Sequence, residues 1–158
     1  MPLIQVVNRS KIKIRPAALK NAAKRTLNAL GYTESELSVL IVDDNEMAGL
    51  NETYRQIGHT TDVLSFPMID GEFAGIAPEM LGDVVISAQT AKAVSLETGT
   101  RFESVLTLLL VHGILHLLGI DHEAGQAEAK QMKMKTAELL AMLGHGGEDF
   151  GWFFDRDE

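Results

Sequence analysis

Hydrophobic and polar positions along the first part of the chain predict two strands separated by a helix. Residues 3–14 are rich in β-branched side chains that partly alternate with polar ones, which is typical of a strand. After Pro16, apolar residues recur at helical spacing as far as Leu30, and Gly31 offers a C-terminal stop. Residues 36–42 then form a compact apolar run that predicts a second, largely buried strand.

The middle of the chain predicts a short helix and two further strands. Asp43, Asp44 and Asn45 can cap a helix whose apolar positions follow at helical spacing. Two compact apolar runs, 63–66 and 84–86, are flanked by glycines and prolines, so both are predicted to be strands.

The last part of the chain is expected to be mainly helical. Residues 87–98 are rich in alanine and predict a helix. Thr100 and Glu103 are spaced as a capping box in front of residues 105–111, which are apolar almost all round and are therefore expected in the core. A final amphipathic helix is predicted over residues 126–143.

This order of elements predicts an α+β fold with α/β-like alternation. We expect residues 1–158 to form a single domain, in which helices pack on a mixed sheet of about four strands and a central buried helix carries the site described below. The acidic, aromatic tail at 145–158 has three open interpretations: it docks on the body, joins a partner chain, or stays mobile.

Composition and charge restrict the possible classes of protein. The 158 residues include no cysteine, which excludes disulfides and cysteine-ligated zinc. No secretory signal or bilayer-length apolar run is visible, so a cytoplasmic location without a membrane partner is expected. The net charge of −8 disfavours broad polyanion binding, and we expect no DNA partner. The basic positions near the N-terminus are expected to form a solvated face.

Three histidines have the spacing of ligands for one metal ion. His112 and His116 are four residues apart, so an α-helix would project both from one face. His122 follows, and Gly119 between them can adopt a left-handed conformation that ends the helix and turns the chain back. Three imidazoles leave a tetrahedral zinc with one open position, as in catalytic sites. We therefore expect the three histidines to bind one metal ion rather than to be packed core residues. Imidazole ligands favour Zn²⁺ over iron or nickel at such a site.

The histidine spacing is similar to the H-E-x-x-H-x-x-G-x-x-H pattern of metzincin proteases. Gly113, however, stands where those proteases have the glutamate that serves as general base. Glycine has no side chain to accept a proton, which disfavours peptide hydrolysis by that mechanism. A zinc metalloprotease remains one alternative.

The full form H-G-x-L-H-L-x-G-x-D-H resembles the bacterial YbeY endoribonucleases, also called rRNA maturation factors. Residues 50–55, 61–67 and 81–87 resemble that family's L-N-x-x-Y-R, T-D-V-L-S-F-P and L-G-D-I-x-I-S segments. The resemblance implies a zinc-dependent, single-strand-specific endoribonuclease that acts in 3′-end maturation of 16S rRNA and in ribosome quality control. Its implied partners are single-stranded RNA, ribosomal RNA or particles, and ribosome-associated proteins. The acidic net charge supports a second alternative, a non-catalytic ribosome assembly factor stabilised by zinc.

Five further polar residues are weighed for roles at the site. Arg55 matches the family's functional arginine, which implies a contact with phosphate; without that match, a surface ion pair is the simpler interpretation. Asp121 either orients a ligand imidazole or caps the turn after the helix. His59 is a candidate phosphate contact or fourth ligand, although a lone loop histidine is usually solvated. Asp62 and Asp83 are expected to be turn and backbone partners rather than catalysts.

Overall fold

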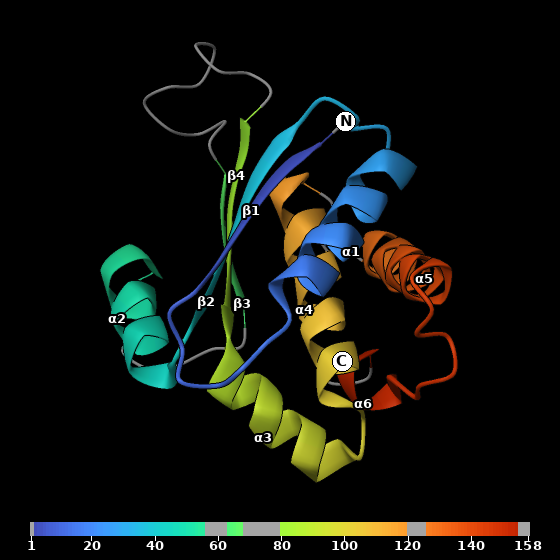
Figure 1. Cartoon of the computed structure of the whole chain (residues 1–158). Coiled ribbons are helices and arrows are strands. Elements are labelled where there is room, and N and C mark those ends of the chain that lie inside the picture. The colour runs from blue at the N-terminus through green and yellow to red at the C-terminus, as the bar shows by residue number, and fades with distance from the viewer. Residues whose placement is uncertain (1, 56–62, 68–79, 120–125, 155–158) are drawn as a thin grey trace.

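A four-stranded mixed sheet forms the centre of the molecule in the computed structural model, which describes residues 2–55, 63–67, 80–119 and 126–154 (Figure 1). The strands are β1 (Leu3–Asn8), β2 (Glu36–Val42), β3 (Val63–Pro67) and β4 (Met80–Ser87). Their order across the sheet is β1-β2-β4-β3. Strands β1, β2 and β4 are parallel, and β3 pairs antiparallel with β4.

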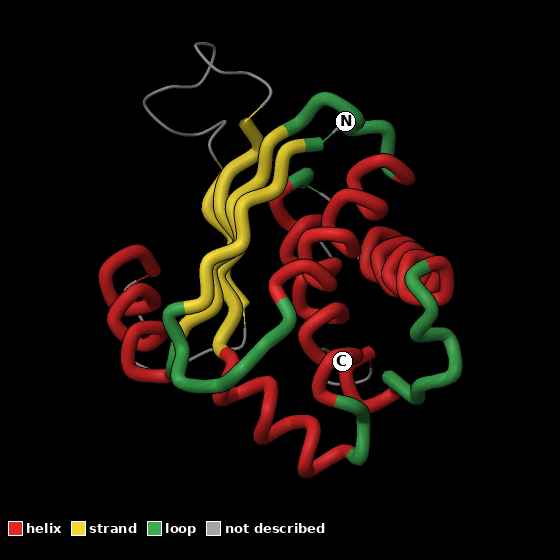
Figure 2. The backbone as a smooth tube through the Cα atoms, viewed as in Figure 1, coloured by secondary structure: helices red, strands yellow, loops and turns green. Residues whose placement is uncertain are grey.

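Helices cover the two faces of this sheet unequally (Figures 1 and 2). On one face lie α1 (Pro16–Ala29) and α4 (Phe102–Leu117), and α5 (Gln126–Met142) packs against α4 from outside. The opposite face carries α2 (Asp44–Arg55). Helix α3 (Ala88–Thr98) continues directly from β4, and the single turn α6 (Gly151–Phe154) lies near the C-terminus. The predicted α+β architecture with a four-stranded mixed sheet is therefore confirmed.

Strand β4 is buried on both faces, because its side chains alternate between the two helical layers. Val84 and Ile86 belong to the main core with α4, whereas Val85 packs with Met47 of α2 and with Leu64 of β3. This alternation follows from the two-residue period of a strand and explains why residues 84–86 are all apolar.

Helix α4 lies in the core, as its all-round apolar character predicts. Every residue from Ser104 to Leu115 is buried. Such a helix can be stable only when other elements surround it, and β3, β4, α1, α3 and α5 all contact α4. No helix in the described ranges combines the length and the apolar character needed to cross a membrane.

The first strand is shorter than predicted. It ends at Asn8 instead of continuing to residue 14, because the Asn8 side chain begins a turn. Asn8 Oδ1 accepts a hydrogen bond from Ser10 N at 2.9 Å, and Asn8 Nδ2 donates one to Ile12 O at 3.0 Å. Asparagine side chains offer the backbone these local alternatives to a sheet ladder.

The predicted capping box before α4 is wrong. The N-cap residue is Arg101, which makes no side-chain capping bond. Thr100 Oγ1 accepts a hydrogen bond from Trp152 Nε1 at 3.0 Å, and the Glu103 carboxylate pairs with Arg15 at 3.2 Å. Both side chains are thus engaged by residues that are distant in the sequence.

Candidate metal centre

His112 and His116 converge on the buried helix α4. Their Nε2 atoms are 3.0 Å apart, and their rings meet nearly edge to face, with centroids 4.5 Å apart and an interplanar angle of 74°. The four-residue spacing on one helix produces this approach, since successive turns carry the two side chains on the same face.

The pair fits a metal that prefers imidazole nitrogen. Zn–N bonds of about 2.0–2.1 Å in a tetrahedral site place two nitrogens roughly 3.3 Å apart, close to the observed separation. Binding requires both Nε2 atoms to be unprotonated, with the ring protons on Nδ1. The donors and their spacing therefore fit zinc.

The two imidazoles differ in depth. His112 is only 7% exposed, whereas His116 is half-buried. His116 is therefore the more accessible of the two imidazoles.

Phe153 packs against the deeper imidazole, a contact that could not be predicted from the sequence. The ring centroids of His112 and Phe153 are 5.0 Å apart at an interplanar angle of 83°. The two residues are far apart in the chain, and no periodic pattern relates them. An aromatic cluster in a tail is the only sequence signal, and it does not identify the partner.

Gly113, next to His112, lies in a close contact between α4 and the sheet. A Cβ atom added there would lie 2.7 Å from Val84 Cγ1 and 3.1 Å from Val63 Cγ2. Ser65 Oγ donates a hydrogen bond to Gly113 O at 2.8 Å across the same contact. The absence of a side chain at this position is therefore also a packing requirement.

Gly119 has the conformation expected of a helix-ending glycine. Helix α4 ends at Leu117, and Gly119 has φ +82°. Its N–H donates to His116 O at 3.0 Å, which tightens the last turn. A Cβ at Gly119 would meet nothing within 4 Å, so the backbone conformation rather than lack of space favours glycine here.

The third predicted ligand, His122, lies outside the described residues. So do three of the polar residues that were weighed for roles at the site, namely Asp121, His59 and Asp62. Within the described ranges, no group of three His, Cys, Asp or Glu side chains is placed to hold a metal. The complete three-histidine site consequently stays a prediction.

The two remaining predicted polar residues lie on other elements than the two histidines. Arg55 is the last residue of α2, on the face of the sheet opposite α4, and its side chain is not among those described. Asp83 faces the outer side of β4, where it lines a cavity of about 480 Å³ together with Arg9 and Phe66.

Comparison with known proteins gives a consistent result for nearly the whole chain. The sequence model of the family described as Endoribonuclease YbeY matches residues 5–144. An endoribonuclease YbeY from Geobacter metallireducens is 48% identical over 130 residues, covering 82% of this chain and 87% of that protein. Another from Syntrophotalea carbinolica is 46% identical over 145 residues, covering 90% and 97%.

The fold also has a solved counterpart. The solution structure of TM1509 from Thermotoga maritima matches with a TM-score of 0.59 and 23% identity, covering 94% of this chain and 99% of that one. The sequence matches, together with this shared fold, show that the chain belongs to the YbeY endoribonuclease family, a family of enzymes.

Proposed function

We propose that this protein is a zinc-dependent, single-strand-specific endoribonuclease that acts in the cytoplasm in 3′-end maturation of 16S rRNA and in ribosome quality control. Family membership supports the reaction class. The convergence of the His112 and His116 Nε2 atoms at 3.0 Å is the observation that carries the metal-dependent part.

His112, His116 and His122 would hold the ion, two of them from α4 and the third from the chain beyond Gly119. Bound zinc supplies a Lewis acid for a phosphoryl oxygen and makes water more acidic. Asp121, adjacent to the third histidine, is suited to accept a hydrogen bond from a ligand's second ring nitrogen, which would fix the tautomer that leaves the other nitrogen free to bind.

Arg55 is proposed to bind the phosphate of the RNA. A guanidinium presents several N–H donors in a planar fork that matches phosphate oxygens. Donors that are already oriented stabilise negative charge as it grows on the phosphoryl group. This role rests on the motif match at residues 50–55.

The structure provides a second argument against the metalloprotease alternative. A glutamate at position 113 would need a Cβ only 2.7 Å from Val84 Cγ1, so the base of that mechanism cannot enter unless Val84 or α4 shifts. The substrate class is therefore better assigned from the family than from the histidine spacing.

A paired cleavage assay tests the proposal. Zinc-loaded protein is expected to cut a single-stranded RNA and to spare a duplex of the same sequence, and chelation is expected to stop cleavage. Arg55→Ala, purified in parallel, should retain one zinc per chain but cleave much more slowly, which also controls for contaminating nuclease. His116→Ala should contain almost no zinc.

Two results would contradict the proposal. Equal cleavage by the parent and Arg55→Ala would remove the role of the arginine. Absence of any chelator-sensitive cleavage, combined with binding of the zinc-loaded protein to ribosomal particles, would instead favour a non-catalytic assembly factor.

A further inference from the structure

The chain beyond α5 turns back onto the body of the molecule. Gly144 has φ +91°, and the N–H of His145 donates to Leu140 O at 2.9 Å, which ends α5 with a tight reversal. The match to the family model ends at this glycine. The residues that follow thus form a segment beyond the family's common core, and we call residues 145–153 the C-terminal segment.

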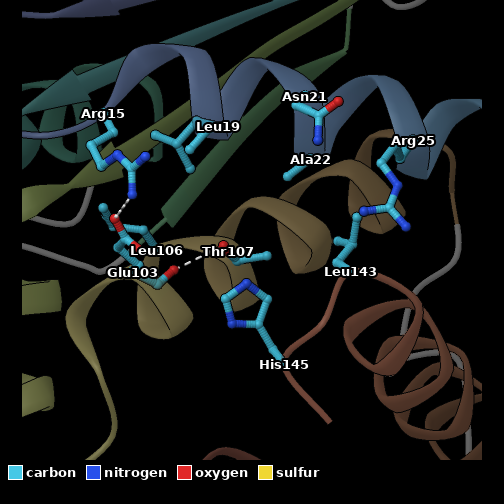
Figure 3. Close-up of a pocket in the computed structure, with 11 residues that line it drawn as sticks. Arg15, Leu19, Asn21, Ala22, Arg25, Glu103, Leu106, Thr107, Leu143 and His145 are labelled. Carbon is cyan, nitrogen blue, oxygen red and sulfur yellow. Dashed lines mark hydrogen bonds and ion pairs between the residues drawn. The ribbon is translucent and has the colours of Figure 1, made fainter.

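The first part of the C-terminal segment is attached to the beginning of α4. The His145 ring points into a groove of about 190 Å³ between α1 and α4 (Figure 3), and its Nδ1 lies 2.8 Å from Ser104 Oγ. Farther on, the Glu148 carboxylate pairs with Arg101 at 2.8 Å.

The second part of the segment is attached by aromatic side chains. Trp152 Nε1 donates a hydrogen bond to Thr100 Oγ1 at 3.0 Å. Phe150 and Phe153 are 7% and 3% exposed, and Phe153 N donates to Phe150 O at 2.9 Å. The anchors Thr100, Arg101 and Ser104 all lie within or just before the first turn of α4, so the segment is held to the same helix that carries the two histidines.

This attachment places the Phe153 ring against His112. The two rings are nearly perpendicular, at 83°, with centroids 5.0 Å apart, which is a favoured arrangement for an aromatic pair. A ring packed in this way restricts rotation of the imidazole about its side-chain bonds. The restricted orientation is the one in which His112 Nε2 faces His116 Nε2.

We propose that Phe153 is a positioning residue for the metal centre: the C-terminal segment holds its ring against His112 and so keeps that imidazole in the orientation that binds zinc. The inference rests on the proposed function. A ligand that is already oriented binds its metal more tightly, since less side-chain freedom is lost on binding.

Zinc affinity and the spectrum of the cobalt-substituted protein test this role without reference to activity. Phe153→Leu removes the ring contacts with His112 and with the neighbouring Trp152 and keeps an apolar side chain. The matched control is Phe150→Leu, which removes a buried ring from the same segment. The Phe150 ring makes no ring contact with another described residue. Zinc dissociation constants are measured by competition with a chelator, and thermal unfolding of the metal-free proteins is compared.

We expect Phe153→Leu to weaken zinc binding about 3- to 10-fold, the equilibrium equivalent of one aromatic pair, and to alter the visible cobalt spectrum. Phe150→Leu should lower thermal stability similarly while leaving both metal properties near those of the parent. If Phe153→Leu does not fold, Phe153→Met, whose flexible unbranched side chain can fill part of the space left by the ring, carries the same expectation.

Three results would overturn the positioning role. One is unchanged zinc affinity and an unchanged cobalt spectrum in the Phe153 variant. Another is an equal change in both variants, which would indicate general loosening of the segment. Failure of the parent protein itself to bind zinc would overturn this inference together with the proposed function, whereas the first two results would leave the proposed function intact.

Discussion

Gly113 sets the distance between helix α4 and the sheet. Its position in the histidine motif shows only that the glutamate that serves metzincin proteases as general base is missing. The lack of space for a side chain at this position could not be predicted, because the atoms that a Cβ would meet belong to Val84 of β4 and Val63 of β3. A motif therefore shows which chemistry is absent, whereas the neighbours across the core show why a side chain at position 113 is disfavoured.

Gly113→Ala is expected to destabilise the protein by about 1–2 kcal/mol. The added methyl overpacks the contact with Val84 Cγ1 at 2.7 Å, and this cost exceeds the gain of about 1 kcal/mol in helix propensity. The measurement is the free energy of unfolding from a denaturant titration of the metal-free protein.

Gly49→Ala in α2 is the matched control, since a Cβ there meets nothing within 4 Å. It should be neutral or stabilising by up to about 1 kcal/mol. Combining Gly113→Ala with Val84→Ala should cost less than the sum of the two, because the smaller side chain makes room for the methyl. Strict additivity, or a stabilising Gly113→Ala, would show that the close contact is absent in solution.

At the scale of the elements, periodicity predicted type and order well and boundaries less well. The helices predicted at 87–98 and 126–143 correspond to α3 and α5 within one residue at each end. The end of β1 and the capping of α4 were predicted wrongly, because local hydrogen bonds of Asn8 end the strand and Thr100 is bonded to the distant Trp152. Competing partners of polar side chains cannot be identified from local sequence alone.

The end of α4 permits a test that separates a backbone effect from a metal effect. Gly119 and Gly99 both follow helices with left-handed φ values, +82° and +78°, and both have open space around the position of a Cβ. Alanine at either position should cost about 1 kcal/mol or more in stability, because the left-handed conformation is strained for residues with a Cβ.

Only Gly119→Ala should also weaken zinc binding, since the turn at Gly119 leads to the predicted third ligand, His122. Chelator competition measures the affinities, and Gly99→Ala provides the correction for general loss of stability. Equal zinc affinity in the two variants would mean that the turn at Gly119 does not position a ligand.

For the whole molecule, the sequence predicted the layers but not how distant segments meet. The alternation of strands and helices was sufficient for the sheet and for the buried position of α4. The C-terminal segment was left with three open interpretations, and its docking depends on Arg101, Thr100 and Ser104, which carry no recognisable docking pattern. The approach of His112 and His116 followed from helical spacing alone, whereas the contact with Phe153 required the tertiary structure.

His145 joins several of these distant segments and should make the stability of the whole molecule depend on pH. Its groove is lined by Arg15, just before α1, by Arg25 of α1 and by Glu103 of α4 (Figure 3). Burial lowers the pKa of His145 below its usual value near 6.5, and the nearby Arg101 lowers it further, against weaker opposing effects of Glu103 and the Glu148 carboxylate.

The unfolded chain therefore binds a proton at His145 more readily than the folded chain does. The free energy of unfolding should fall as the pH drops through about 6.5, and the decline should level off below the folded-state pKa.

The test compares the metal-free parent with His145→Asn, whose side chain can accept a hydrogen bond from Ser104 Oγ, by denaturant titration between about pH 8 and pH 5. The difference between the two curves isolates His145 from the other histidines, because these are common to both proteins. The parent should lose its advantage over the variant as the pH decreases, and parallel curves would show that the histidine titrates equally in the folded and unfolded chains.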